Sequence, residues 1–143
     1  MTSARVRVGD RVTGEIARGL LIFIGIGRDD SAADAKYVAG KVRDIRVFEN
    51  DEGKPMDRSV VEIGGSVLVV SQFTLYGDVR RGRRPAFDQA APPEAARALY
   101  EELVRELRSA QVPVATGEFQ AMMQVELVND GPATILIDSK KLM

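Results

Sequence analysis

The chain has 143 residues, of which 45% are hydrophobic and 29% charged, enough to bury one substantial core as a single domain over residues 1–143. It contains no cysteine and no histidine, which excludes disulfides, thiolate nucleophiles, cysteine-type zinc sites and Ser-His-Asp triads. A formal net charge of −1 gives no overall attraction to nucleic acid, so such binding requires a local patch. Membrane-span and signal-peptide patterns are lacking, and we expect a cytoplasmic protein.

The first third of the chain predicts a hairpin, a buried strand and a helix. Residues 5–8 and 11–16 alternate between polar and apolar side chains around a tight turn, as hairpin strands do. Residues 20–26, LLIFIGI, form a continuous apolar run, which we interpret as a strand buried on both faces. Ser31 can cap a following helix, whose apolar spacing ends near Arg46.

The middle of the chain predicts two strands and a loop. Residues 47–50 resemble a strand edge that enters a polar turn. Residues 67–70 are a second apolar run, which becomes polar at Ser71 and Gln72. Residues 77–85 carry the glycine, proline and charge pattern of a loop.

The last third predicts one helix and two strands. A proline pair at 92 and 93 precedes the clearest amphipathic stripe in the chain, which predicts a helix. Residues 123–127 alternate as a strand, and residues 133–137 predict a final strand. The resulting order, β-β-β-α-β-β-α-β-β, indicates an α/β fold: a small sheet or barrel-like structure covered by two helices.

GIGRDD, residues 25–30, lies between a predicted strand and a predicted helix, where a dinucleotide-binding turn would lie. The third glycine of that motif is missing, and we expect no βαβ repeats around it. An ordinary strand-to-helix turn is therefore the favoured interpretation.

The corner after the second apolar strand is a candidate catalytic site. Its candidate residues are Ser71, Gln72, Phe73 and Thr74. Backbone N–H groups at a strand end can face a developing oxyanion, and those around Gln72 and Phe73 are the candidates. From composition alone, hydroxyls that only satisfy the start of a turn are the favoured interpretation. A seryl or threonyl nucleophile would need a base, which no histidine can supply.

VRRGRRP, residues 79–85, is a candidate phosphate-binding loop. Its guanidinium groups, which can make bidentate contacts to phosphate, belong to Arg80, Arg81, Arg83 and Arg84. The alternative is a solvated basic loop.

The Gly131-Pro132 step interrupts two predicted strands. A cis bond there would hold the flanking carbonyls in a fixed arrangement that no side chain could reproduce, whereas an ordinary turn is also compatible with the preceding Asn-Asp. The sequence leaves both geometries open.

Together, SQFTL, RRGRRPAF, MQVELVNDGPAT and the terminal LIDS resemble the D-aminoacyl-tRNA deacylase family in order and spacing. The resemblance implies a homodimer of α/β barrel-like subunits that binds aminoacyl-tRNA and not DNA, without cofactor or metal. It implies hydrolysis of the ester bond of D-aminoacyl-tRNA and glycyl-tRNA, in a proofreading role. Thr74 matches the family's active-site threonine, which we interpret as a positioning group.

The resemblance assigns chiral selectivity to Gly131 and Pro132. It implies that their bond is cis and that its carbonyls enter the partner subunit's pocket, where they exclude L-amino acids. The substrate-binding candidates around them are Met123, Asn129, Ala133 and Thr134. Ala133 stands where valine is usual, and we expect the family's first strand, with an arginine near the Gly-Pro loop, to be missing at the N-terminus.

Two other functions are compatible with these residues. A tRNA-end-binding dimer that has lost catalysis would fit the missing strand and Ala133. A Ser/Thr hydrolase of D-peptides would need a base near Ser71 or Thr74.

Overall fold

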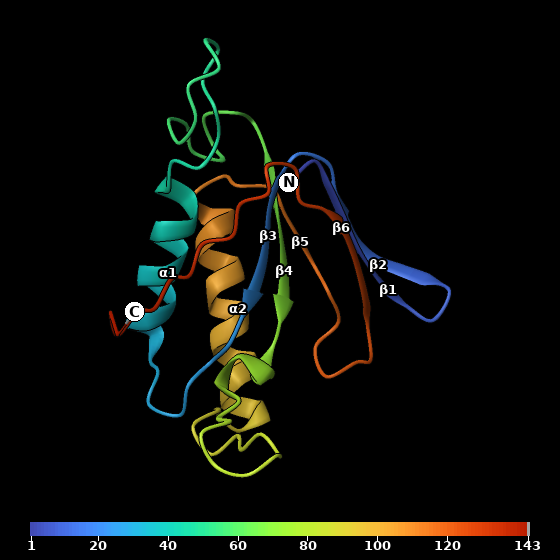
Figure 1. Cartoon of the computed structure of the whole chain (residues 1–143), viewed down its shortest axis with the longest axis vertical. Coiled ribbons are helices and arrows are strands. Elements are labelled where there is room, and N and C mark those ends of the chain that lie inside the picture. The colour runs from blue at the N-terminus through green and yellow to red at the C-terminus, as the bar shows by residue number, and fades with distance from the viewer. Residues whose placement is uncertain (143) are drawn as a thin grey trace.

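The computed structural model describes residues 1–142, and these form two helices packed on a pair of small sheets (Figure 1). The elements in chain order are β1 (Ser3–Val8), β2 (Arg11–Ile16), β3 (Gly19–Ile24), α1 (Ala32–Asp44), β4 (Ser66–Ser71), the short 3₁₀ helix η1 (Phe73–Tyr76), α2 (Pro93–Ser109), β5 (Val114–Thr116) and β6 (Gln124–Val128). None of the helices in this part of the chain is long and apolar enough to cross a membrane.

One sheet is parallel, with strand order β3-β4-β5. Parallel neighbours need a long crossover, and α1 and α2 provide the two crossovers, so the chain does contain consecutive βαβ units. The expectation that such units are absent was therefore wrong. The signal was hidden because β5 has only three residues.

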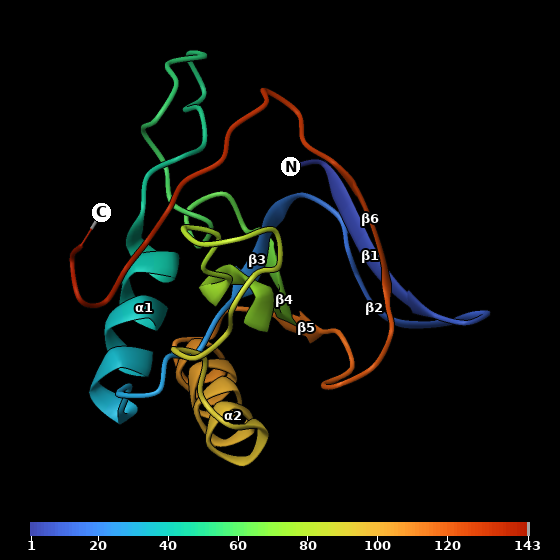
Figure 2. The same cartoon turned by 60° about the horizontal axis from the view of Figure 1, so that its bottom comes forward.

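The other sheet is antiparallel, with strand order β2-β1-β6. The predicted hairpin is confirmed, and Gly9 at φ 60° allows its tight turn. Figure 2 shows this sheet on one side of the parallel sheet and the two helices on the other. Gly14 of β2 lets that strand approach the carbonyl of Thr116 in β5, but no ladder joins the sheets over residues 1–142, and they do not close into a barrel.

Strand β4 lies at the centre of the core, where its alternating side chains reach both layers. Val67 and Val69 pack into the cluster under the helices, whereas Leu68 and Val70 pack against the antiparallel sheet, and all four are fully buried. The expectation of burial on both faces for residues 20–26 was wrong in part. They do form a strand, β3, but it is the outer strand of its sheet, and Phe23 is 41% exposed.

Both helices form where their sequence signals predict. Ser31 and Asp34 make a reciprocal capping box at the start of α1. The buried stripe of α2 includes Leu103 and Leu107, which belong to the same hydrophobic cluster under the helices as Val67 and Val69. These signals are local, so they can be recognised without knowledge of the tertiary structure.

Two expected strands are not formed. Residues 47–50 make only an isolated bridge, from Phe48 to Arg58. Residues 133–137 pair with no strand among the described residues, and the preceding strand, β6, ends at Val128.

Candidate functional site

The Ser-Gln-Phe-Thr corner lies where β4 ends and η1 begins. Ser71 is the last residue of β4, and Gln72 is the N-cap of η1. The backbone N–H of Gln72 donates to the carbonyl oxygen of Ile24 at 2.8 Å. Because it already has an acceptor, this one of the N–H groups around Gln72 and Phe73 is not available to an oxyanion.

The next two backbone N–H groups, of Phe73 and Thr74, occupy a different position. They open the 3₁₀ helix, and the first N–H groups of a helix have no acceptor within it. Within residues 1–142 neither donates a hydrogen bond. The corner thus offers two adjacent donors to an anionic oxygen.

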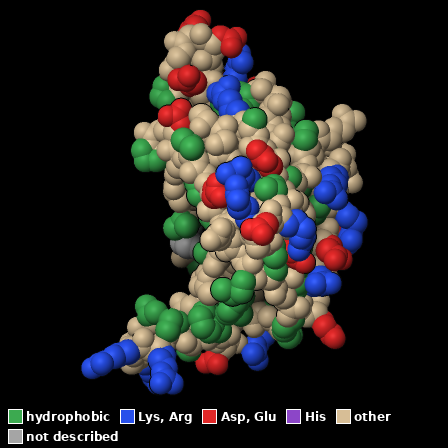
Figure 3. Space-filling model, turned by 90° about the vertical axis from the view of Figure 1, so that its right-hand side faces the viewer, with side chains coloured by type: hydrophobic (Ala, Val, Ile, Leu, Met, Phe, Trp, Pro, Cys, Tyr) green, Lys and Arg blue, Asp and Glu red, His purple; other side chains and the backbone are tan. Residues whose placement is uncertain are grey.

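Side chains at the corner add one polar contact and an apolar surface. The side-chain amide of Gln72 donates to the hydroxyl oxygen of Thr74. Phe73 is 58% exposed and packs edge-on against Phe87, with ring centroids 5.1 Å apart. Phe87 was missed in the sequence, because it lies in a loop without periodicity. Figure 3 shows hydrophobic side chains gathered at this lower end of the molecule, with basic side chains projecting beyond them.

The arginine loop divides into one paired residue and three exposed ones. Arg80 makes a bidentate contact with Asp78, at 2.9 and 2.7 Å, and this contact lowers the pKa of Asp78 to about 2. Arg81, Arg83 and Arg84 are exposed and make no ion pair or hydrogen bond with residues 1–142. Arg80 therefore forms its ion pair within the loop, whereas the guanidinium groups of the other three arginines can pair with the phosphates of a polyanion.

The Gly131-Pro132 peptide bond is cis, so the geometry that the sequence left open is now assigned. Asn129 ties this exposed loop together, because its side-chain oxygen accepts the N–H of Ala133 at 3.2 Å and its amide lies 3.5 Å from the Thr134 hydroxyl. Three of the four expected substrate-binding residues thus form one loop. Met123 is different: it is half-buried and packs against the core between the sheets.

The Gly-Pro loop, which follows β6, and the Ser-Gln-Phe-Thr corner lie near opposite ends of β4 (Figure 1). The loop lies near the beginning of β4. The carbonyl of Val128, just before the loop, accepts the N–H of Thr2, and the carbonyl of Met1 accepts the N–H of Gly19. Gly19 in turn pairs with Ser66, the first residue of β4. Ser71 is the last residue of that six-residue strand, about 17 Å further along. One chain therefore does not bring the two groups together.

Two backbone N–H groups of the GIGRDD turn are hydrogen-bonded to oxygens of the protein itself. Gly27 donates to the carboxylate of Asp30 at 2.7 Å, and the N–H of Arg28 donates to the carbonyl of Gln89 at 2.9 Å. Because these groups are satisfied by protein oxygens, the turn lacks a free phosphate cradle, despite the βαβ units around it.

Solved structures of similar fold place the chain among small α/β proteins with two helices. A structure described as c-Myc DNA Unwinding Element Binding Protein is similar at a TM-score of 0.88 and 36% identity, over 94% of this chain and 91% of that one. A probable eukaryotic D-amino acid tRNA deacylase has a TM-score of 0.75 at 19% identity, over 88% of each chain, a likeness of fold alone.

Sequence comparisons then identify the family. The family model described as D-Tyr-tRNA(Tyr) deacylase matches residues 1–138. Proteins named D-aminoacyl-tRNA deacylase from Symbiobacterium thermophilum and Koribacter versatilis are 58% and 56% identical over 141 residues, 99% of this chain and 93% and 94% of theirs. The chain belongs to the D-aminoacyl-tRNA deacylase family, whose members are hydrolases that act on ester bonds.

Proposed function

We propose that the protein hydrolyses the ester bond joining a D-amino acid, or glycine, to the terminal ribose of tRNA. Its family membership supports this activity, and the observation that carries the chemical argument is the pair of unoccupied N–H donors at Phe73 and Thr74, beside the Thr74 hydroxyl. Charged tRNA is a cytoplasmic substrate, so the proposal places the protein there.

In the proposed reaction a water molecule adds to the ester carbonyl carbon. The negative charge that develops on the carbonyl oxygen is stabilised by the N–H groups of Phe73 and Thr74. The ribose oxygen then leaves and takes up a proton, and the water oxygen stays with the amino acid. The chain has no histidine, so the neighbouring ribose 2′-hydroxyl assists the proton transfer. An aminoacyl ester is already activated by its ammonium group, which makes orientation of the water the main requirement.

Chiral selectivity in this proposal comes from a second copy of the chain. The Gly131-Pro132 loop is exposed and too far from its own corner to act there, but in a homodimer it can enter the partner subunit's site. Its carbonyl groups would then occupy the space that the side chain of an L-amino acid needs. Exclusion by a fixed obstacle separates two enantiomers more strongly than attraction alone, because both carry the same groups.

The apolar surface at Phe73 and the exposed arginines of the loop lie beside the corner at the same end of the molecule (Figures 1 and 3). Aromatic side chains stack on bases, and guanidinium groups pair with phosphates. We assign this end of the molecule to the terminal nucleotides of tRNA.

The test uses purified protein with tRNA charged with D-tyrosine, L-tyrosine or glycine. We expect release of D-tyrosine and glycine, with the L-charged tRNA spared, from a species that sediments as a dimer. Equal rates for D- and L-tyrosine would contradict the selectivity. Tight tRNA binding without turnover would instead favour a tRNA-end-binding dimer that has lost catalysis.

A further inference from the structure

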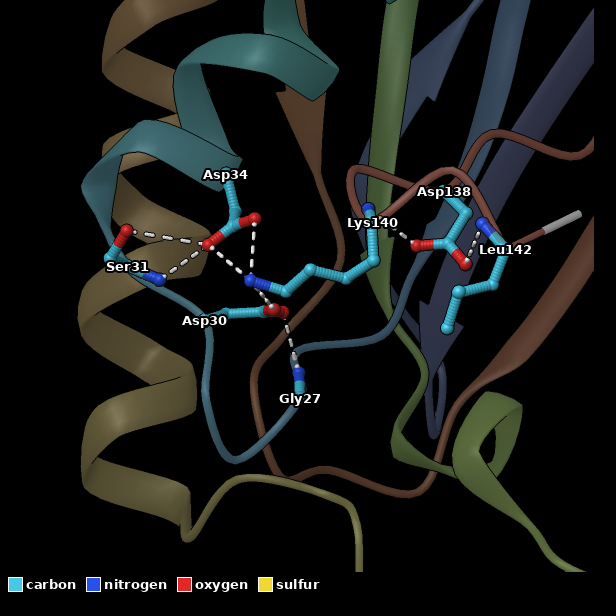
Figure 4. Close-up of polar contacts among 7 residues, drawn as sticks. All are labelled: Gly27, Asp30, Ser31, Asp34, Asp138, Lys140 and Leu142. Carbon is cyan, nitrogen blue, oxygen red and sulfur yellow. Dashed lines mark hydrogen bonds and ion pairs between the residues drawn. The ribbon is translucent and has the colours of Figure 1, made fainter.

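Lys140, near the C-terminus, forms an ion-pair cluster with two carboxylates at the start of α1 (Figure 4). Its Nζ lies 3.0 Å from Asp34 Oδ1 and 3.7 Å from Asp30 Oδ1. The contact with Asp34 joins residues that are 106 positions apart in the sequence. The C-terminal segment is thereby attached to the turn that precedes α1.

The two carboxylates are poorly exposed and close to each other. The side chains of Asp30 and Asp34 are only 10% and 14% exposed, whereas that of Lys140 is 45% exposed. Two like charges in a partly desolvated place repel each other unless a cation lies between them. Within residues 1–142, Lys140 is the one residue that forms an ion pair with either carboxylate.

The C-terminal segment is folded so that Lys140 points at this pair. The carboxylate of Asp138 accepts the backbone N–H of Lys140 at 2.9 Å and that of Leu142 at 3.4 Å (Figure 4). The Asp138 carbonyl accepts the N–H of Lys141 at 2.9 Å. These bonds make a compact turn. Lys140 therefore projects from an ordered turn.

The carboxylates in turn fix a glycine-containing turn that packs against the catalytic corner. Asp30 Oδ2 accepts the N–H of Gly27 at 2.7 Å. A Cβ atom added to Gly27 would lie 2.6 Å from the hydroxyl of Tyr76, and one added to Gly25 would lie 3.1 Å from the Cβ of Leu75. Leu75 and Tyr76 are the last two residues of η1, so this turn forms the surface on which the helix rests.

We propose that Lys140 is a positioning residue for the hydrolytic reaction. By neutralising Asp30 and Asp34 it fixes the turn at residues 25–30, which sets the place of η1 and hence of the Phe73 and Thr74 N–H groups. The inference rests on the proposed function for its kinetic consequence, but not for its structural one. Lys140 touches no reacting atom in this scheme, and the effect passes through Asp30, Gly27 and Tyr76.

The test compares Lys140→Met with Lys141→Met, which removes the same charge one position further along. The Lys141 ammonium instead lies over the ring of Tyr37, 5.5 Å from its centroid. For Lys140→Met we expect a fall in kcat of about fivefold with KM within about twofold, because misplacement remote from the chemistry affects the transition state most. We also expect amide exchange of Gly27, Leu75 and Gly77, whose N–H groups are hydrogen-bonded to Asp30, Gln72 and Thr74, to accelerate by about threefold or more. Lys140→Arg should restore both, and Lys141→Met should change neither.

A double variant adds a control for direct action of the lysine on RNA. Asp34→Asn keeps an acceptor for Ser31 but removes the charge that Lys140 pairs with. If the ion pair carries the effect, Lys140→Met adds little to Asp34→Asn. Full additivity, or equal exchange rates in Lys140→Met and Lys141→Met, would overturn the inference. A wild-type protein without deacylase activity would overturn the proposed function instead, and the exchange measurement would still decide the role of Lys140.

Discussion

Gln72 donates a side-chain hydrogen bond to the hydroxyl oxygen of Thr74, two residues further along the same corner. That oxygen accepts through a lone pair, and the hydroxyl donates to no atom of residues 1–142, so its proton can be donated to the attacking water or to the substrate. The arrangement orients the hydroxyl without offering a base that could remove its proton. It therefore favours a positioning role for Thr74.

Thr74→Ala should lower kcat by about 10- to 100-fold, roughly 1.4–2.7 kcal/mol of barrier, while Thr74→Ser should retain most of the activity. The reason is that Thr74→Ala removes the hydroxyl and the methyl group, whereas Thr74→Ser removes the methyl group alone and keeps the hydroxyl. Single-turnover deacylation of D-tyrosyl-tRNA measures the effect. An aminoacyl group trapped covalently on Thr74 would contradict the positioning role.

Gly131→Ala should raise the rate on L-aminoacyl-tRNA relative to the D form. Gly131 has φ 143°, where an L side chain is strained, and a Cβ there would lie 3.3 Å from the backbone nitrogen of Ala133. The loop must then rotate, which displaces its carbonyl groups. We expect the L-to-D rate ratio to rise by about tenfold or more.

A matched control for this variant is Gly53→Ala. Gly53 also has a positive φ, 82°, but nothing lies within 4 Å of an added Cβ, and it stands in a different loop. A side chain is thus placed at a positive φ elsewhere in the chain. If Gly53→Ala raised the L-to-D rate ratio as much as Gly131→Ala, the effect would not depend on the position of the Gly131-Pro132 loop.

Arg81→Ala and Arg84→Ala should each reduce the salt dependence of tRNA binding. Loss of one phosphate contact lowers the slope of log K against log[salt] by about 0.7 to 0.9. Arg80→Ala is the control and should change the slope less, because Arg80 is paired with Asp78. Binding titrations over a range of potassium chloride concentrations check this. Equal slopes in all three variants would mean that the loop is a solvated surface without specific phosphate contacts.

Sequence reasoning succeeded where the signal is local. The stripe of α2, the capping box at Ser31 and the hairpin each depend on neighbours a few residues apart. It failed for β5, whose three residues acquire strand geometry only by pairing with β4. It also assigned a strand to residues 133–137, where the apolar pattern is present but the segment pairs with no strand among the described residues.

For the candidate site, the motif residues could be named but not their bonding. The sequence does not show that the Gln72 N–H donates to the carbonyl of Ile24, or that Arg80 forms an ion pair with Asp78. Nothing in the sequence around Lys140 indicated its ion pair, since its partner Asp34 is 106 residues away. Such contacts depend on how distant segments meet in the fold, which side-chain type alone does not determine.

Leu68→Ala should destabilise the protein by about 2–5 kcal/mol, because it leaves a cavity at a fully buried position between the two sheets. Urea unfolding gives the free energy. Val12→Ala is the control: this side chain is 44% exposed on β2, and we expect about 1 kcal/mol or less. Equal losses in the two variants would show that the sheets do not pack as described.

Asp34 should make the stability of the protein depend on acid pH. The backbone N–H of Ser31, and then Lys140, lower the pKa of Asp34 from 3.8 to about 2. Because the folded chain prefers the ionised carboxylate, this stabilisation is fully present above about pH 4 and is lost as the pH falls towards 2. Asp34→Asn lacks the titrating group, so the difference in Tm between wild type and variant should shrink over that interval. A difference that stays constant from pH 6 to pH 2 would mean that Asp34 has the same pKa in the folded and unfolded chains.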